Sequence, residues 1–274
     1  MATLDCRTLF LSDLHLGTRV CRADYLLDLL RRVNCDRLVL VGDVFDVWAM
    51  RRRIFWDPAQ EAVVQQVLSL ALHGVEVIYV PGNHDELVRD FVGSEIRGVR
   101  IQRELVHWTA DGRRFRVSHG DEFDGVVRHN RVAHWLGDFG YNLLLNGSRH
   151  LNTIRRHLGH RYWSLSAWLK TRVSGAAREY IRRFEEAAVA TARKGGFDGC
   201  ICGHIHKPNV EQFGDVLYCN DGDWVEHCTA LVEDRDGVLS LLHWSDHRGV
   251  EASEPKTSAH ARIDLETRLT KCPT

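Results

Sequence analysis

The sequence lacks three features that would place it in a special class of protein. None of its apolar runs approaches the roughly 18 residues that a membrane-spanning helix needs, which excludes a helical span. Met1 to Phe10 contain no basic segment followed by a long apolar one, so we expect no export signal. Internal repeats and low-complexity tracts are also missing, which argues against a repeat architecture.

The cysteines show no pattern typical of a disulfide framework, although there are eight of them. Cysteines inside cells are ordinarily reduced, whereas small secreted domains carry paired ones. We therefore expect a cytoplasmic protein with free thiols.

Length and composition are those of an ordinary globular protein. The 274 residues are 44% hydrophobic and 27% charged, as in average soluble domains. A chain of this length can bury a substantial core, either as one large domain or as a domain with an insertion.

Several short apolar runs predict buried strands. In the first half of the chain they lie at 7–12, 37–41 and 75–80. Further strands are predicted at 113–118, 199–202, 216–219, 228–232 and 238–244.

Helices are predicted between the first strands. Leucines at helical spacing predict one over 24–33, while Asp57-Pro58 marks the start of a second and His73-Gly74 its end. Strands that alternate with helices predict an α/β layer architecture.

The composition and the hydrophobic pattern of the chain change after residue 127. Residues 128–195 contain no convincing strand and are rich in Leu, Trp, Arg and Ala, which predicts several helices inserted into the scaffold. We therefore expect a core domain made of 1–127 and 196–246, with 128–195 as a helical cap. Residues 247–274 are polar and are predicted to form a poorly ordered tail.

Charge is unevenly distributed along the chain. Residues 128–195 carry thirteen basic and four acidic side chains, a net charge of +9, which leaves −10 on the rest of a chain whose total is −1. A basic segment of this kind suits phosphate-bearing ligands, nucleic acid or an anionic membrane surface. The alternative is a solvated helical face with no binding role.

Five short segments end in residues that commonly bind metals, and four of them directly follow a strand-like run. They are Asp13-Leu14-His15, Gly42-Asp43, Gly82-Asn83-His84-Asp85, His119-Gly120-Asp121 and Gly203-His204-Ile205-His206. Side chains at the ends of neighbouring strands can converge on one point even when they are far apart in sequence. A single such segment is more often structural, but five together favour a binuclear metal site.

The donor atoms predict which metals would bind. The set is Asp13, His15, Asp43, Asn83, His119, His204 and His206, seven nitrogen or oxygen donors with no cysteine. If Asp43 bridges two ions, each ion receives four protein ligands. Such a donor set argues against structural zinc and favours two divalent ions, foremost Mn²⁺, with Fe or catalytic Zn²⁺ as alternatives.

These segments resemble the calcineurin-like metallophosphoesterase family, whose pattern is Asp-x-His, Gly-Asp-x-x-Asp, Gly-Asn-His-Asp/Glu, a lone His and Gly-His-x-His. The resemblance implies a four-layer αββα sandwich of two β-sheets flanked by helices, with an inserted helical cap. It also implies that Asp13, His15, Asp43 and His206 hold one ion, and that Asp43, Asn83, His119 and His204 hold the other.

The same resemblance implies a hydrolytic reaction at phosphorus. Paired cations lower the pKa of a bridging water and neutralise charge on the phosphoryl oxygens. His84 would stabilise that charge or protonate the leaving oxygen, and Asp85 would fix the orientation of its ring. Asp46 and Asp121 would either support the ligands or cap turns.

Within the superfamily, the chain is similar to the UDP-2,3-diacylglucosamine pyrophosphatases of lipid A synthesis. The similar stretches are residues 10–16, residues 42–48, His119-Gly120-Asp121 and the late helical insertion. This similarity implies a Mn²⁺-dependent pyrophosphatase that acts on a lipid-linked sugar nucleotide. We expect Lys170 and Arg172 to bind the substrate, and the protein to associate peripherally with the anionic inner face of the cytoplasmic membrane.

Two departures leave the substrate open. The lipid A enzymes carry Arg where this chain has His84, and Glu122-Phe123-Asp124-Gly125 here replaces an acidic stretch that contains cysteine. A paralogue that hydrolyses another phosphoester is one alternative. Nucleic acid is a disfavoured substrate, because leucines and helix formers dominate the insertion and no recognition motif is present. A non-catalytic scaffold is disfavoured because none of the seven ligands is missing.

Overall fold

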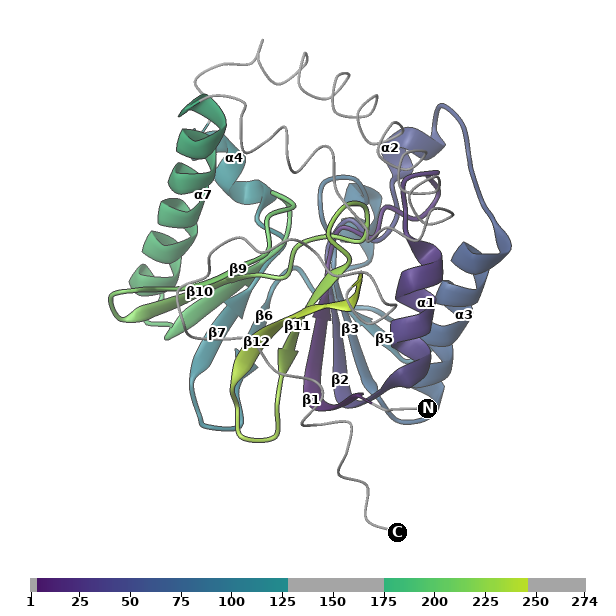
Figure 1. The fold of residues 1–274 in the computed structure, drawn as a ribbon, viewed down its shortest axis with the longest axis horizontal. Helices are drawn as coiled ribbons and strands as arrows, with labels where there is room; N and C mark the ends of the chain where they lie inside the picture. Colours follow the sequence, from purple (N-terminus) through teal and green to yellow (C-terminus); the bar gives the residue numbers. More distant parts are fainter. Residues whose placement is uncertain (1–3, 128–174, 246–274) are drawn as a thin grey trace, which may run out of the picture.

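Two β-sheets lie face to face in the computed structural model, with helices on both outer faces (Figure 1). The structure describes residues 4–127 and 175–245. Among these residues, no helix is both long and apolar enough to cross a membrane.

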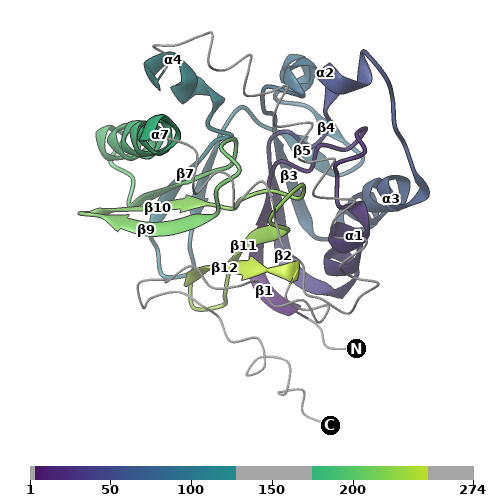
Figure 2. The ribbon, with the colours of Figure 1, turned by 45° about the horizontal axis from the view of Figure 1, so that its top comes forward.

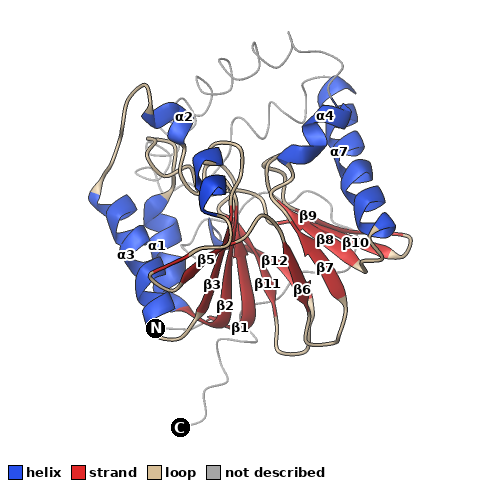
Figure 3. Cartoon of the chain, turned by 180° about the vertical axis from the view of Figure 1, so that it is seen from behind, coloured by secondary structure: helices blue, strands red, loops and turns tan. Residues whose placement is uncertain are grey.

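The larger sheet has seven strands in the order β12-β11-β1-β2-β3-β5-β4. Strands β1, β2, β3 and β5 are parallel to one another, and β4 and β11 pair antiparallel at either side. Helices α1 and α3 cover its outer face (Figure 3). The bounds are β1 Leu4–Leu11, α1 Ala23–Arg32, β2 Val33–Val41, α3 Pro58–Leu72, β3 Glu76–Val80, β4 Glu95–Ile96, β5 Val99–Ile101, β11 Thr229–Glu233 and β12 Leu239–His243.

The smaller sheet has five strands in the order β6-β7-β8-β10-β9, with α7 against its outer face. Its bounds are β6 Leu105–Trp108, β7 Arg114–Val117, α7 Gly175–Lys194, β8 Gly199–Cys202, β9 Asn209–Phe213 and β10 Val216–Asn220. Four short helical turns lie in the loops: α2 Val47–Met50, η1 Glu86–Phe91, η2 Asp121–Phe123 and α4 Asp124–Val127. Figure 2 shows α4 on the same side of the molecule as α7.

Burial on both faces explains why the strands of the larger sheet are continuous apolar runs. In β1, Leu9 and Leu11 pack toward the helices, while Phe10 packs toward the other sheet. Phe115 and Ile201 meet Phe10 in that layer from the smaller sheet. A strand buried on both sides cannot alternate apolar with polar residues, so the four layers αββα account for the pattern.

Helix α3 begins and ends where its sequence signals indicate. The Asp57 carboxylate accepts a hydrogen bond from the backbone N–H of Gln60 at 2.9 Å, and Pro58 occupies the first turn. Gly74, with φ of +96°, lets the chain leave the helix.

The predicted αββα sandwich is confirmed, and every predicted strand is present with small shifts of its ends. Strands β4, β5, β6 and β9 were not predicted from the sequence. They are short, and β9 lies at an edge where half-exposed residues weaken the apolar pattern. Helix α7 falls within the predicted insertion, whereas 128–174 and the tail 247–274 lie outside the described residues, so the domain boundaries stay predictions.

All seven cysteines of the described part are buried, and their thiols are free. Burial raises the pKa of several of them, for example Cys219. A buried thiol of this kind is unreactive, so these cysteines serve as small apolar side chains in the core.

Candidate metal centre

Each of the five metal-ligand segments directly follows a strand: β1, β2, β3, β7 and β8. Within each sheet these strands are parallel, so their carboxyl ends share one edge. Figure 3 shows the resulting loops at one end of the sandwich, between α2 and α4. The strands predicted at 7–12, 37–41, 75–80, 113–118 and 199–202 correspond to these five, so the structure confirms the strand before each segment.

One group of donors consists of Asp13, His15 and His206. The Nε2 atoms of the two histidines lie 3.3 Å apart, and Oδ1 of Asp13 lies 3.0 Å from Nε2 of His206 and 3.8 Å from Nε2 of His15. All three side chains are buried or nearly so. Three donor atoms from loops 191 residues apart thus meet at one point.

A second group of donors lies on the β2, β3, β7 and β8 loops. Nε2 of His119 lies 3.3 Å from Oδ2 of Asp43 and 3.2 Å from Oδ1 of Asn83. A ligand atom of His204 lies within 4.8 Å of those of Asp43 and His119. Every residue that the sequence predicted as a ligand therefore belongs to one of two neighbouring groups.

The backbone of the ligand loops is strained. Seven non-glycine residues of the described chain have a left-handed φ, and five of them are predicted ligands: Asp13, His15, Asp43, His204 and His206. This conformation costs roughly 1–2 kcal/mol per residue, although Asp and His tolerate it better than most. Strain of this kind concentrates at functional sites, because the fold holds these side chains in place against local preference.

Glycines in the same loops allow close approach. A Cβ on Gly82 would lie 2.2 Å from Oδ1 of Asp43, and a Cβ on Gly203 would lie 2.5 Å from Oδ2 of Asp13. Both distances are far below van der Waals contact. Each motif glycine therefore makes room for the ligand carboxylate of another strand.

His84 lies at the rim of the site and is oriented by Asp46. Nδ1 of His84 lies 3.0 Å from Oδ1 of Asp46, and the other oxygen of Asp46 lies 3.2 Å from Nδ1 of His15. The His84 ring also contacts the exposed indole of Trp48, with centroids 4.4 Å apart. One carboxylate thus holds two imidazoles and leaves each Nε2 facing the site.

The predicted role of Asp85 in orienting His84 is wrong. Its buried carboxylate accepts hydrogen bonds from the Tyr79 hydroxyl at 2.5 Å and from the backbone N–H groups of Val44 and Gly82 at 2.7 and 2.6 Å. Asp85 therefore ties the β2 loop to the β3 loop, while Asp46 takes the place next to His84. Asp121 pairs through both oxygens with Arg89, at 2.8 and 2.7 Å.

The electrostatics of the site favour positive charge. Burial would raise the pKa of Asp13, yet the neighbouring imidazoles of His206 and His15 lower it well below its usual value. Burial would lower the pKa of His119, yet the Asp43 carboxylate raises it well above the usual range. The carboxylates thus stabilise protons on the imidazoles in the position where cations would lie.

The donor set fits divalent cations. Oδ1 of Asp13 is fully buried without a hydrogen bond in the described structure, and such a group is costly unless something positive pairs with it. Two imidazole nitrogens point at the same region. Nitrogen and carboxylate donors without thiolate suit Mn²⁺, Fe or catalytic Zn²⁺.

Two residues behind the ligands were missed in the sequence. The Ser12 hydroxyl lies 2.6 Å from both Oδ2 of Asp13 and Oδ1 of Asp221, and burial raises the pKa of Asp221 well above its usual value. A signal was available, because Asn220-Asp221-Gly222-Asp223 directly follows the predicted strand over 216–219.

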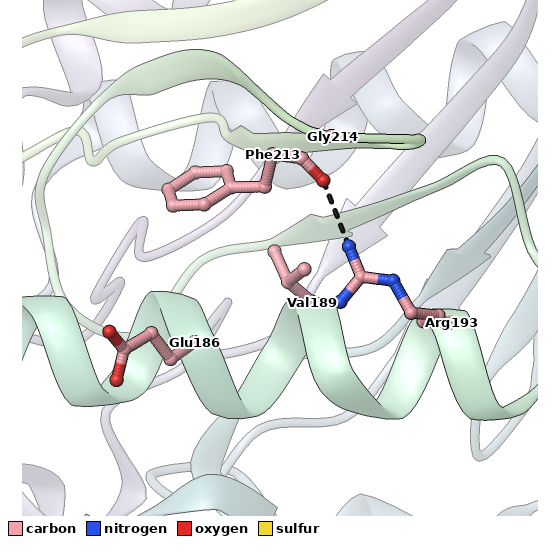
Figure 4. A pocket seen from close by; sticks show the side chains of 5 residues that line it. All are labelled: Glu186, Val189, Arg193, Phe213 and Gly214. Carbon is pink, nitrogen blue, oxygen red and sulfur yellow. Dashed lines mark hydrogen bonds between the residues drawn. The ribbon is translucent and has the colours of Figure 1, made fainter.

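Lys170 and Arg172, the predicted substrate-binding residues, lie outside the described part of the chain. A shallow surface pocket of about 410 Å³ lies between α7 and the β9–β10 turn (Figure 4). Glu186, Val189, Arg193, Phe213 and Gly214 line it. It contains none of the metal-centre residues, and Arg193 is tied there to the Phe213 carbonyl at 3.0 Å.

The αββα sandwich, with histidines and carboxylates gathered at its strand ends, defines a class of metal-dependent phosphoester hydrolases. The profile of the Calcineurin-like phosphoesterase family matches residues 6–208, and the chain belongs to that family. It is therefore a phosphoester hydrolase.

Relatives with assigned names match most of the chain. The UDP-2,3-diacylglucosamine hydrolase of Xanthomonas campestris pv. campestris (strain B100) is 28% identical over 246 residues, which cover 84% of this chain and 96% of that protein. The hydrolase of the same name from Hahella chejuensis (strain KCTC 2396) is 26% identical over 246 residues, 85% of this chain and 96% of its own. The solved phosphoesterase Yfce from E. coli covers 87% of this chain and 93% of its own, at a TM-score of 0.43 and 16% identity.

Proposed function

We propose that the protein is a binuclear-metal phosphoesterase that hydrolyses a phosphodiester or a pyrophosphate. The observation that carries the proposal is the convergence of Asp13, His15 and His206 beside Asp43, Asn83 and His119, from strand ends of both sheets. Family membership adds independent support.

In this proposal the two donor groups hold two divalent ions. Asp13, His15 and His206 would hold one, Asn83, His119 and His204 would hold the other, and Asp43 would contribute to both. When bound, the ions supply a nucleophile from water and neutralise charge on the phosphoryl oxygens. Mn²⁺ is the foremost candidate, with Fe and Zn²⁺ as alternatives.

His84 acts in this proposal as the acid for the leaving group. Its Nδ1 lies 3.0 Å from Asp46, so its Nε2 faces the site, 4.0 Å from Oδ2 of Asp43. The side chain is about one quarter exposed, so it can reach an incoming phosphoester. A proton on Nε2 can pass to the departing oxygen.

The preferred substrate is a lipid-linked sugar nucleotide of the UDP-2,3-diacylglucosamine type. Relatives that bear this substrate in their name match the chain over 84–85% of its length. Trp48, which contacts His84, is exposed, and Ile54 and Trp56 are exposed further along the same segment, with arginines 51–53 before them in the sequence. Apolar and cationic side chains side by side suit an amphiphilic phosphate.

Hydrolysis of bis(p-nitrophenyl) phosphate with Mn²⁺ tests the metal centre. We expect Asp43→Ala to abolish activity, and His84→Ala to lower kcat about 10²- to 10⁴-fold, the usual contribution of a general acid. Asp215→Ala and His73→Ala, two exposed residues away from the site, are matched controls. Full activity in Asp43→Ala would disprove the metal assignment, whereas normal turnover in His84→Ala would disprove only its role as the acid.

A substrate panel tests the specificity. We expect UMP release from UDP-2,3-diacylglucosamine to exceed hydrolysis of single-stranded DNA or RNA, together with binding to anionic vesicles that weakens in salt. Preferential cleavage of nucleic acid would instead support the alternative of a paralogue that acts on another phosphoester.

A further inference from the structure

One carboxylate outside the predicted ligand set bonds directly to a predicted metal ligand. Oδ1 of Asp124 lies 2.9 Å from Nε2 of His204 and accepts a hydrogen bond from the Tyr180 hydroxyl, also at 2.9 Å. Two donors thus share one oxygen atom. The Asp124 side chain is 18% exposed and that of His204 is 12% exposed, so water competes weakly for these bonds.

This contact selects the tautomer of His204. A ring that donates its Nε2–H to a carboxylate carries its free lone pair on Nδ1. Nδ1 is then the nitrogen left to bind an ion together with Asp43 and His119, the two residues with which His204 forms a candidate metal group. A carboxylate behind an imidazole also raises its basicity, which strengthens metal binding.

The surroundings of His204 leave its ring little freedom. The ring meets the His119 ring edge to face, with centroids 5.1 Å apart, and it lies 6.0 Å from the ring of fully buried Phe184. Its backbone N–H donates to Oδ2 of Asp13 at 2.9 Å. Asp124 therefore acts on a ring whose plane is already set by packing, and decides which nitrogen carries the proton.

The two bonding partners come from opposite sides of residues 128–174. Asp124 opens α4, which ends at Val127, and Tyr180 lies near the start of α7, which begins at Gly175. The hydrogen bonds from Tyr180 to Asp124 and between Asp124 and His204 therefore connect both α4 and α7 to one predicted metal ligand. Asp124 also falls within Glu122-Phe123-Asp124-Gly125, where the sequence departs from the lipid A enzymes.

We propose that Asp124 and Tyr180 are positioning residues that hold His204 ready for the ion bound with Asp43 and His119. The proposal rests on the two-metal centre proposed above. Asp124 fixes the protonated nitrogen, and Tyr180 fixes Asp124. The group of Asp13, His15 and His206 meets His204 through its backbone N–H, which donates to Asp13, and not through its ring. Asp124 and Tyr180 act on the ring, so we expect their effect mainly at one of the two sites.

Mn²⁺ titration of the metal-free protein tests this inference, by calorimetry and by the paramagnetic resonance of free Mn²⁺. We expect two sites in the wild type, and a roughly 10- to 100-fold weaker affinity at one of them in Asp124→Ala, the usual effect of losing a carboxylate behind a ligand. Tyr180→Phe should weaken the same site less, and Asp124→Glu should recover part of the affinity. Saturating Mn²⁺ should restore most of the turnover of Asp124→Ala.

Asp215→Asn is the matched control, because it removes the charge of another carboxylate that bonds to α7, through Arg193, far from the site. A purely structural role for Asp124 would lower the Tm of the metal-free protein and leave both affinities unchanged. Wild-type affinities in Asp124→Ala, or equal weakening at both sites, would overturn the inference while the two-metal centre stood. Failure of the wild type to take up two ions would overturn the centre itself and this inference with it.

Discussion

At the scale of single residues, the carboxylates behind the ligands organise the site. Asp46 contacts His15 with one oxygen and His84 with the other, and it also caps α2 through the Ala49 N–H at 2.8 Å. Burial would raise the pKa of Asp46, but the two histidines hold it well below its usual value. Asp46 is therefore ionised at neutral pH and fixes two imidazoles together.

Replacing Asp46 by Asn separates its charge from its capping role. Asn caps a helix as well as Asp does, so we expect the Tm to change little. Loss of the charge should lower kcat about 10- to 100-fold, because neither His15 nor His84 is then held in its tautomer. The measurement is turnover of bis(p-nitrophenyl) phosphate beside a thermal melt, with Asp57→Asn at the cap of α3 as control. Equal activity in both variants would contradict the role assigned to Asp46.

At the scale of elements, each predicted metal ligand is positioned by the first residues of the loop that follows its strand. Strand β3 ends at Val80, and two residues later Gly82 passes so close to Asp43 that no side chain fits between them. The β2 and β3 loops are further tied by Asp85, which bonds to both. The β2 and β3 loops therefore form one rigid unit.

Gly82→Ala should displace Asp43 from the site. A Cβ at 2.2 Å from Oδ1 of Asp43 forces one of the two loops to move, and even a displacement of about 1 Å can cost roughly 100-fold in rate. We expect turnover and Mn²⁺ affinity to fall together. Gly112→Ala is the control, because its added Cβ meets open space and only its φ of +87° is strained. Gly112→Ala should lose about 1 kcal/mol of stability and keep its activity. If Gly82→Ala retained its affinity for Mn²⁺, the predicted displacement of Asp43 would be wrong.

At the scale of the whole molecule, a buried polar network joins the two sheets away from the metal centre. Glu233 on β11 bonds to the Thr8 hydroxyl on β1 at 2.7 Å and lies 2.9 Å from Nε2 of His107 on β6. Arg7 adds an ion pair at 2.6 Å. Burial would raise the pKa of Glu233, but the bonds from His107 and Thr8 lower it below its usual value.

Such a shift makes the stability depend on pH in a defined direction. A carboxyl group whose pKa is lower in the folded state stabilises the protein above its unfolded pKa, about 4.3 for Glu, and loses this effect as the pH falls through the folded value. Glu233→Gln should cost about 1.5–3 kcal/mol at neutral pH and flatten the decline of Tm below about pH 4.3.

Glu104→Gln removes an exposed partner of Arg116 and serves as the control for the melts. It should change the free energy of unfolding by less than about 1 kcal/mol, and the Tm correspondingly little. If the Tm falls equally steeply with decreasing pH in the wild type and in Glu233→Gln, Glu233 does not carry the pH dependence of stability.

Sequence patterns predicted the parts of the site that depend on local order. Strands buried on both faces leave apolar runs, and the ligands directly follow those runs, so their convergence at one edge could be predicted. The partner of His84 could not be predicted, because Asp46 lies on a different loop and meets His84 only in the folded chain. The contact between Asp124 and His204 spans 80 residues and depends on how α4 meets the smaller sheet. Neither contact produces a periodic pattern in the sequence from which it could be predicted.

The position of β1 in the larger sheet has a consequence for biosynthesis. β1 lies between β2 and β11, so during synthesis it keeps one open edge until residues 229–233 have been made. His204 and His206 are made after the other predicted ligands, so both donor groups stay incomplete until these two residues have left the ribosome. Open strand edges invite pairing with other chains, so this nascent polypeptide is vulnerable to aggregation until β11 has been made.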